Sequence, residues 1–141
     1  MKILAIETAT EACSAALEIN NSCMYRHEIA PRKHTELILP MIDSLLKEAD
    51  IKVNSLDVIA LGCGPGAFTG VRIAIGIAQG LAFPFDIPVI PVSTLATLAQ
   101  QFSKDYNYVA TAIDARMKEI YWGLYKKNSS KIMEEVIKES V

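Results

Sequence analysis

Two acidic residues stand at the ends of apolar segments, where their carboxylates could hold a metal ion. Glu7 follows Ala5-Ile6 and Asp114 follows Ala112-Ile113, so their surroundings form a faint internal repeat. Carboxylate oxygens are good Mg²⁺ ligands, and this pair, with Thr8 next to the first acid, could bind Mg²⁺ on a nucleotide in a cleft. The alternative is structural, because acids at strand ends often accept hydrogen bonds from the next turn.

The segment Gly62–Gly70 is rich in glycine and lies between a strand pattern and a helix pattern. It has no lysine and neither G-x-x-x-x-G-K-[ST] nor G-x-G-x-x-G spacing, so it lacks the specific phosphate-binding motifs. Thr69 and the first N–H groups of the helix could still bind an anion. A tight turn is the commoner use of Gly-Pro-Gly, and a loop that contacts a partner is the third interpretation.

Other groups with catalytic potential are few. The two histidines, His27 and His34, have no second ligand at metal-site spacing, so we expect no metal site built from this chain alone. Ser14, Cys13 and Cys63 are candidate nucleophiles, but the sequence places no base beside them. The three cysteines show no Cys-x-x-Cys spacing, which indicates free thiols in a reducing compartment. We therefore expect no catalytic residue.

The composition is typical of a globular protein. Of the 141 residues, 51% are hydrophobic and 21% are charged, which is too apolar for a disordered chain. The net charge of −2 offers no basic surface, so direct nucleic-acid binding is not expected. The N-terminus lacks the apolar length of a signal peptide, and Val71–Phe85, interrupted by Arg72 and Gln79, is too short to span a bilayer. These features favour a cytoplasmic location without membrane contact.

The hydrophobic pattern predicts the element order βββαβαβα. Strands are expected at Lys2–Thr8, Ala12–Ile19, Ser22–Ile29, Asp57–Gly62 and Pro88–Val92, and helices at His34–Ala49, Gly70–Phe83 and after Ser93. Asn20-Asn21 suits a hairpin turn, Ser93 suits an N-cap, and Pro40 should kink its helix or make the first turn irregular. Hairpins followed by β-α alternation imply an α/β fold with a mixed sheet flanked by helices. That order matches one lobe of the ribonuclease H-like or actin-like ATPase architecture.

The rest of the chain begins a second, similar unit. Strand patterns cover Tyr108–Ile113 and Glu119–Tyr125, and Ile132–Lys138 could be a strand or a short helix. Together with the repeat around Glu7 and Asp114, these patterns predict a duplicated fold. We expect a first lobe at residues 1–104 and an incomplete start of a second lobe at residues 105–141.

The predicted helix Val71–Phe83 is apolar on nearly all faces, which is typical of a helix buried on two sides. Alanines recur every four residues, and Gly76 and Gly80 are also four apart, although an interior glycine costs about 1 kcal/mol relative to alanine. One face should cover the sheet, and the other should pack against a partner or beneath the second lobe. We expect a partner interface shared with the helix His34–Ala49 and formed by Leu37, Met41, Leu45, Ile73, Gly76, Ile77 and Gly80.

Four stretches resemble a known family: Leu4–Ser14, Pro31–Glu36, Gly64–Arg72 and Ile113–Arg116. They are similar to the TsaB (YeaZ) family, whose bacterial members take part in biosynthesis of tRNA threonylcarbamoyladenosine. The resemblance extends over essentially the whole chain, and its GPGxFTGxR block is highly specific.

The resemblance implies an actin-like fold and a non-catalytic paralogue of the subunit TsaD, which carries the metal and the threonylcarbamoyl-transfer chemistry. It implies docking on TsaD through first-lobe helices, with the ATPase TsaE joining the pair, a homodimer in isolation, and contact with tRNA only through the complex. No cofactor is expected in this chain beyond weak Mg–nucleotide binding near a partner interface.

The sequence departs from the family pattern in three places. TsaD-like proteins are expected to carry two metal-binding histidines on the helix that starts near His34, but Ile38 stands four residues later. The usual first-lobe aspartate of actin-like ATPases is Glu7 here. Family members also continue past residue 141, so we expect a fragment or a shortened form. The alternative function is a small Mg-ATP-dependent ATPase or kinase lobe.

Overall fold

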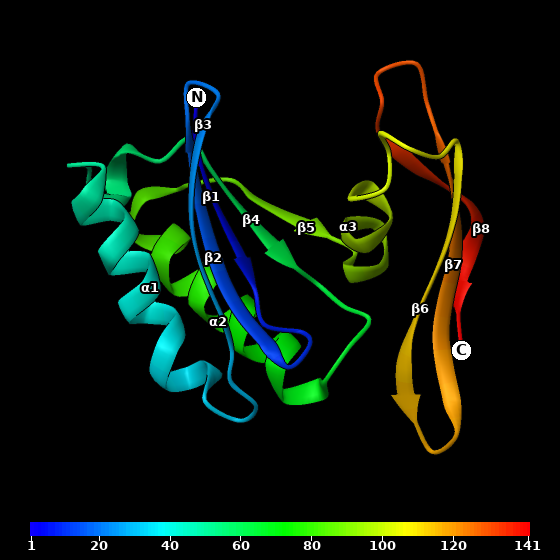
Figure 1. Cartoon of the computed structure of the whole chain (residues 1–141). Coiled ribbons are helices and arrows are strands. Elements are labelled where there is room, and N and C mark those ends of the chain that lie inside the picture. The colour runs from blue at the N-terminus through cyan, green and yellow to red at the C-terminus, as the bar shows by residue number, and fades with distance from the viewer.

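The first five strands form one mixed sheet in the computed structural model, which describes residues 1–141 (Figure 1). The sheet order is β3-β2-β1-β4-β5, with β1 antiparallel to β2 and parallel to β4. The strands are β1 (Lys2–Glu7), β2 (Ala12–Ile19), β3 (Ser22–Ile29), β4 (Val58–Gly62) and β5 (Val89–Val92). The predicted α/β fold with a mixed sheet is therefore confirmed.

Local sequence signals account for most element boundaries. Asn20 and Asn21 both have positive φ, 51° and 68°, as the β2–β3 hairpin turn requires. Ser93 accepts a hydrogen bond from the Ala96 N–H at 3.1 Å, so it caps α3 as predicted. The helices are α1 (His34–Glu48), α2 (Phe68–Ala82) and α3 (Thr94–Gln100), with short 3₁₀ turns η1 (Val53–Ser55) and η2 (Phe83–Phe85). Pro40 lies inside α1, which runs on past it as one helix.

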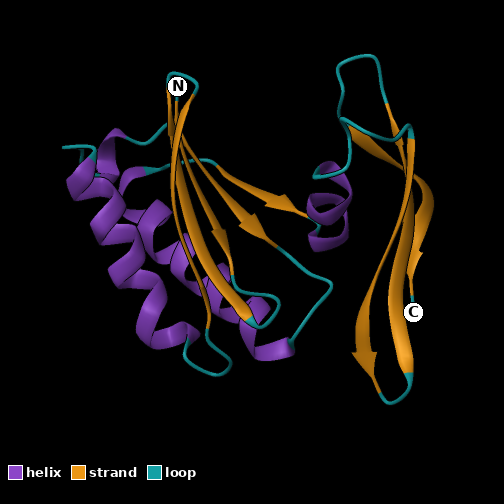
Figure 2. Cartoon of the chain, viewed as in Figure 1, coloured by secondary structure: helices purple, strands orange, loops and turns teal.

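The main core lies between one face of the sheet and the helices α1 and α2 (Figure 2). Alternation along the strands sends Leu4, Leu17 and Ile59 to this face, where each is fully buried. The opposite face, which includes the paired residues Ala5 and Ala16, contributes to neither hydrophobic cluster. Both long helices therefore lie on one side of the sheet.

The first turn of α2 packs directly on the turn between β1 and β2. The Thr8 hydroxyl donates to the Gly70 carbonyl at 2.7 Å, and the Ala67 N–H donates to the Ala9 carbonyl at 2.7 Å. A Cβ atom on Gly70 would lie 2.0 Å from the Thr8 carbonyl oxygen, far inside van der Waals contact. This approach supports a structural use of the glycine-rich segment and starts α2 at Phe68, two residues before the predicted Gly70.

The helical stretch from α2 through η2 is longer than the sequence predicted. Phe68–Phe85 spans 18 residues with a mean hydropathy of 1.3, which is long and apolar enough to cross a membrane by length and composition only. In the structure its Ala74, Ala78 and Ala82 are buried in the main core. These contacts pack one face of the helix on the sheet, while 22% of the 18-residue window is buried.

The second unit is a separate three-stranded antiparallel sheet, β6 (Tyr108–Arg116), β7 (Glu119–Lys127) and β8 (Met133–Ser140). The segment Ile132–Lys138, predicted as strand or helix, is thus mostly strand. Leu95 and Ala99 of α3 form a small core with Tyr125 and Met133 of this sheet. The predicted boundary at residue 104 stays a prediction, although α3, which precedes it, packs on the second unit.

Three polar side chains join the two units at the start of α3. The Glu139 carboxylate accepts hydrogen bonds from the hydroxyls of Ser93 and Tyr125. Burial and the bond to this carboxylate hold the pKa of Tyr125 well above its ordinary value of 10.0. The neutral phenol is therefore part of the folded structure.

We predict opposite effects of Gly→Ala substitution at the two ends of α2. The added methyl group in Gly70→Ala would collide with the Thr8 backbone. The first turn of α2 would have to move away from the β1–β2 turn, which should lower the free energy of unfolding by about 3 kcal/mol. Gly80→Ala is the matched control, because nothing lies within 4 Å of its Cβ position. It should raise the free energy of unfolding by about 1 kcal/mol. Urea unfolding measures both, and equal effects would contradict the packing described here.

We predict that Tyr125→Phe lowers the free energy of unfolding by about 1 kcal/mol near neutral pH, because one hydrogen bond to Glu139 is lost. The folded-state pKa of Tyr125 lies above 10.0, so its stabilisation is complete below pH 10.0 and is lost as pH rises toward the folded-state pKa. Urea unfolding of both proteins across this range should show the difference shrinking with alkalinity. A constant difference would mean that Tyr125 does not titrate with unfolding.

Candidate functional site

The outward face of α2 is an unusual helix surface because it carries two exposed glycines. Nothing lies within 4 Å of a Cβ atom placed on Gly76 or Gly80. Neither glycine is therefore required by packing inside this chain. One turn further, Phe83 is 87% exposed, so the face combines open backbone with a large apolar side chain.

The predicted interface residues fall into three groups, of which the first is the pair of open glycines, Gly76 and Gly80. Leu37, Met41, Ile73 and Ile77 are half-buried at the edge of the main core, where α1 and α2 lie beside each other. Leu45 corrects the prediction, because it is fully buried in that core. A stripe with four-residue spacing rotates around a helix of 3.6 residues per turn, so its third member turns inward. We call the six others, with Phe83, the α1–α2 surface.

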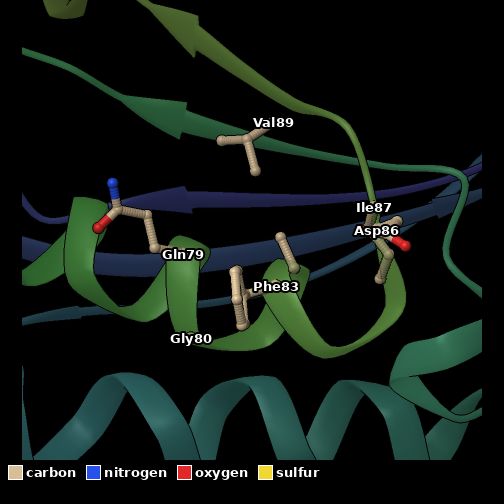
Figure 3. Close-up of a pocket in the computed structure, with 7 residues that line it drawn as sticks. Gln79, Gly80, Phe83, Asp86, Ile87 and Val89 are labelled. Carbon is tan, nitrogen blue, oxygen red and sulfur yellow. The ribbon is translucent and has the colours of Figure 1, made fainter.

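An open groove adjoins this surface at the C-terminal end of α2 (Figure 3). Its volume is about 730 Å³, and it is lined by Gln79, Gly80, Ala82, Phe83, Asp86, Ile87 and Val89. The Gly80 position leaves the groove without a side chain on one wall. An apolar side chain from a partner would fit such a groove, because it lies beside already exposed apolar surface.

Sequence reasoning missed two exposed aromatic residues at the ends of α2. Phe68 lies under the Arg72 guanidinium, which is 3.2 Å from the ring centroid. Phe83 extends the glycine face, since it follows Gly80 by three residues and Gly76 by seven. That spacing was the signal that could have found it.

The predicted nucleotide-proximal residues are not equally available. Thr8 corrects the prediction, because it is fully buried and its hydroxyl bonds to Gly70. Glu7 accepts hydrogen bonds from the Ala9 N–H at 2.6 Å and the Thr94 hydroxyl at 3.4 Å, which is the turn-capping role. Asp114 likewise accepts from the Arg116 N–H at 2.7 Å, but it also lines a large cavity.

The two cysteines among the candidate nucleophiles lie in surroundings that disfavour a thiolate. Partial burial raises the pKa of the Cys63 thiol, the charges of Glu139 and Glu7 add to this, and a backbone hydrogen bond partly offsets it. Burial and Glu28 raise the pKa of Cys13 in the same way. Both thiols are therefore weaker acids than an ordinary cysteine.

Comparison with known proteins places this architecture. The family model described as TsaD, tRNA N6-adenosine threonylcarbamoyltransferase, matches residues 26–141. The chain is 48% identical over 134 residues to the tRNA threonylcarbamoyladenosine biosynthesis protein TsaB of Escherichia coli, covering 94% of this chain and 58% of that protein. It is 50% identical over 125 residues to TsaB of Haemophilus influenzae, covering 86% and 52%.

A solved structure, YeaZ from Pseudomonas aeruginosa, superposes with a TM-score of 0.95 at 48% identity, covering 99% of this chain and 66% of that one. The chain thus spans a little over half the length of the curated relatives it matches. The expected actin-like lobe is confirmed by this match and by the family model. The chain belongs to the TsaD family and is a homologue of its TsaB (YeaZ) members.

Proposed function

We propose that this chain is a non-catalytic partner subunit in the biosynthesis of tRNA threonylcarbamoyladenosine. It docks on a TsaD-like catalytic subunit through the α1–α2 surface, and a TsaE-like ATPase joins the pair. In isolation the same surface pairs two copies of the chain. Contact with tRNA is made only through the complex, which works in the cytoplasm.

The observation that carries the proposal is the pair of open glycines on α2. In an exposed helix interior each glycine costs about 1 kcal/mol relative to alanine, and no contact within the chain offsets that cost. A second helix packed against Gly76 and Gly80 would approach the backbone closely and use the space that they leave. The half-buried Ile73 and Ile77 and the exposed Phe83 would then lose their remaining contact with water.

The comparisons support the proposal that the chain acts in tRNA threonylcarbamoyladenosine biosynthesis. Relatives at 48% and 50% identity are named for tRNA threonylcarbamoyladenosine biosynthesis. Their alignments, over 134 and 125 residues, are long enough to include both α1 and α2. The family model of the catalytic subunit TsaD also matches most of this chain. Two paralogues that share this lobe could pack equivalent helices against each other in a pseudo-symmetric pair.

The chemistry of the chain supports an accessory role. The acidic side chain of Glu7 is engaged by its own turn and by Thr94, and the surroundings of Cys63 raise the pKa of its thiol. The alternative, a small Mg-ATP-dependent ATPase or kinase lobe, is favoured by one observation, the position of Asp114 at a large cavity. Glu7, the other member of the predicted carboxylate pair, does not line this cavity, although Glu11 of the β1–β2 turn does.

We predict that Gly76→Glu abolishes the complex with the TsaD-like subunit, because it places a charge where the helix backbones approach. Gly76→Ala should have opposite effects on the stability of the free chain and on binding to the partner. It should raise the free energy of unfolding of the free chain by about 1 kcal/mol and still weaken binding. Co-purification, followed by size-exclusion chromatography with light scattering, measures the complex.

Ser129→Glu in the exposed β7–β8 turn is the control for an added charge and should leave the complex intact. An intact complex with Gly76→Glu would contradict docking through α2. Tight binding by Gly76→Ala would show that the glycines are not close contacts, even if the surface is correct.

A further inference from the structure

The first sheet ends in an edge strand, β3, whose outer backbone groups have no strand beside them. β3 follows β2 through a two-residue turn, so hydrogen-bonded and non-hydrogen-bonded pairs alternate from the Ile19–Ser22 pair onward. The Ala30 N–H donates to the Glu11 carbonyl at 3.1 Å, which fits this alternation. The even-numbered residues of β3 therefore bond to β2, and the odd-numbered residues point their N–H and C=O groups away from the sheet.

β3 is the most regular of the four free strand edges in the structure. β5 is four residues long and contains Pro91, which has no N–H to donate. The pairings of β6 and β8 with β7 have register shifts, and such irregularities are a common protection of sheet edges. β3 pairs with β2 in unbroken register over its eight residues and contains no proline. A regular edge with free N–H and C=O groups is a site for pairing with another strand.

The side chains of β3 are complementary to a second copy of the same strand. Tyr25 and Ile29 are 70% and 64% exposed, and both lie on the sheet face opposite the helices, on either side of His27. Arg26 and Glu28 lie on the helix face, and Glu28 takes part in no ion pair. A two-fold axis at His27 would place each Tyr25 opposite Ile29 of the other copy. It would also place each Arg26 opposite Glu28.

We infer that β3 pairs with β3 of a second copy of this chain, in an antiparallel register centred on His27. In this register the outward-pointing N–H and C=O groups of His27, Tyr25 and Ile29 face each other and form backbone hydrogen bonds. The aromatic–branched pair and the opposite-charge pair are both favourable across strands. The two five-stranded sheets become one continuous sheet. This interface shares no residue with the α1–α2 surface.

The helices leave room for this pairing. α1 packs mainly over β2 and also contacts β3, where Ser44 and Glu48 accept hydrogen bonds from the Arg26 guanidinium. Neighbouring strands lie about 4.8 Å apart, so the β2 strands of the two copies would be about 14 Å apart. Two α1 helices at that separation do not collide, because packed helices approach to about 8–10 Å. The Tyr25 carbonyl accepts from the Arg26 side chain at 3.0 Å and keeps a second lone pair for the partner strand.

The test is sedimentation velocity over a concentration series, on the chain carrying Gly76→Glu to block pairing through the α1–α2 surface. A dimer should persist in this chain. His27→Pro, added to it, removes the central outward N–H without breaking a bond to β2 and should weaken the dimer at least tenfold. Cys23→Pro is the matched control, because Cys23 also points its N–H outward but lies beyond the paired residues. It should leave the dimer intact.

Charge-exchange variants in the same chain test the register without removing a backbone group. Arg26→Glu brings acidic side chains together in its own dimer, and Glu28→Lys brings basic ones together, so each dimer should weaken about tenfold. A mixture of the two variants restores opposite charges at both positions. It should associate about tenfold more tightly than either variant alone.

Amide hydrogen exchange distinguishes strand pairing from other contacts on β3. The amides of Tyr25, His27 and Ile29 should become protected as the chain concentration rises. Those of Met24 and Arg26, which bond to β2, should be protected at every concentration. This alternation is expected only for a strand added at the edge, since a helix or loop packed on the sheet face leaves the outward amides unbonded.

Four results would overturn the proposal. They are a monomeric Gly76→Glu chain at every concentration, a dimer that His27→Pro leaves unchanged, a charge-exchange mixture that associates no more tightly than its components, and protection without alternation along β3. The mixture does not depend on whether His27→Pro folds. None of these results bears on docking of a TsaD-like subunit through the α1–α2 surface.

Discussion

The position of α2 depends on one close backbone approach, between its first turn and the turn that joins β1 to β2. Gly66 and Gly70 have no room for a side chain against Ala9 and Thr8, and the Thr8 hydroxyl completes the contact by bonding to Gly70. Because this contact fixes where the helix starts and how it is rotated, it also fixes which residues of α2 face the sheet.

The rotation of α2 determines which residues lie on each of its two faces. The alanines pack flat against the sheet, where small side chains let the helix lie close to the strands, and the glycines point to the opposite side. The same constraint leaves the N-terminus of α2 at the cavity that α1 also reaches. The open glycines of the α1–α2 surface thus depend on how the first turn of α2 packs on the β1–β2 turn.

Strand and helix positions could be predicted because alternation, four-residue spacing and turn residues such as Asn20 and Asn21 act locally. The exposure of the interface residues predicted on α1 was harder to predict. Leu45 lies at the predicted spacing but is turned into the core, because the stripe rotates along α1. Thr8 and Glu7 look free in sequence, yet contacts with Gly70 and Thr94, distant in the chain, engage both. Only long-range packing could reveal those contacts.

Hydrogen exchange on the chain, with and without its TsaD-like partner, tests docking through the α1–α2 surface most directly. Docking through this surface should slow exchange in the outer segments of α1 and α2, around residues 36–48 and 70–85, and leave exchange in the β6–β8 sheet unchanged. Protection confined to β6–β8, or to the sheet face opposite the helices, with α2 unchanged, would contradict it.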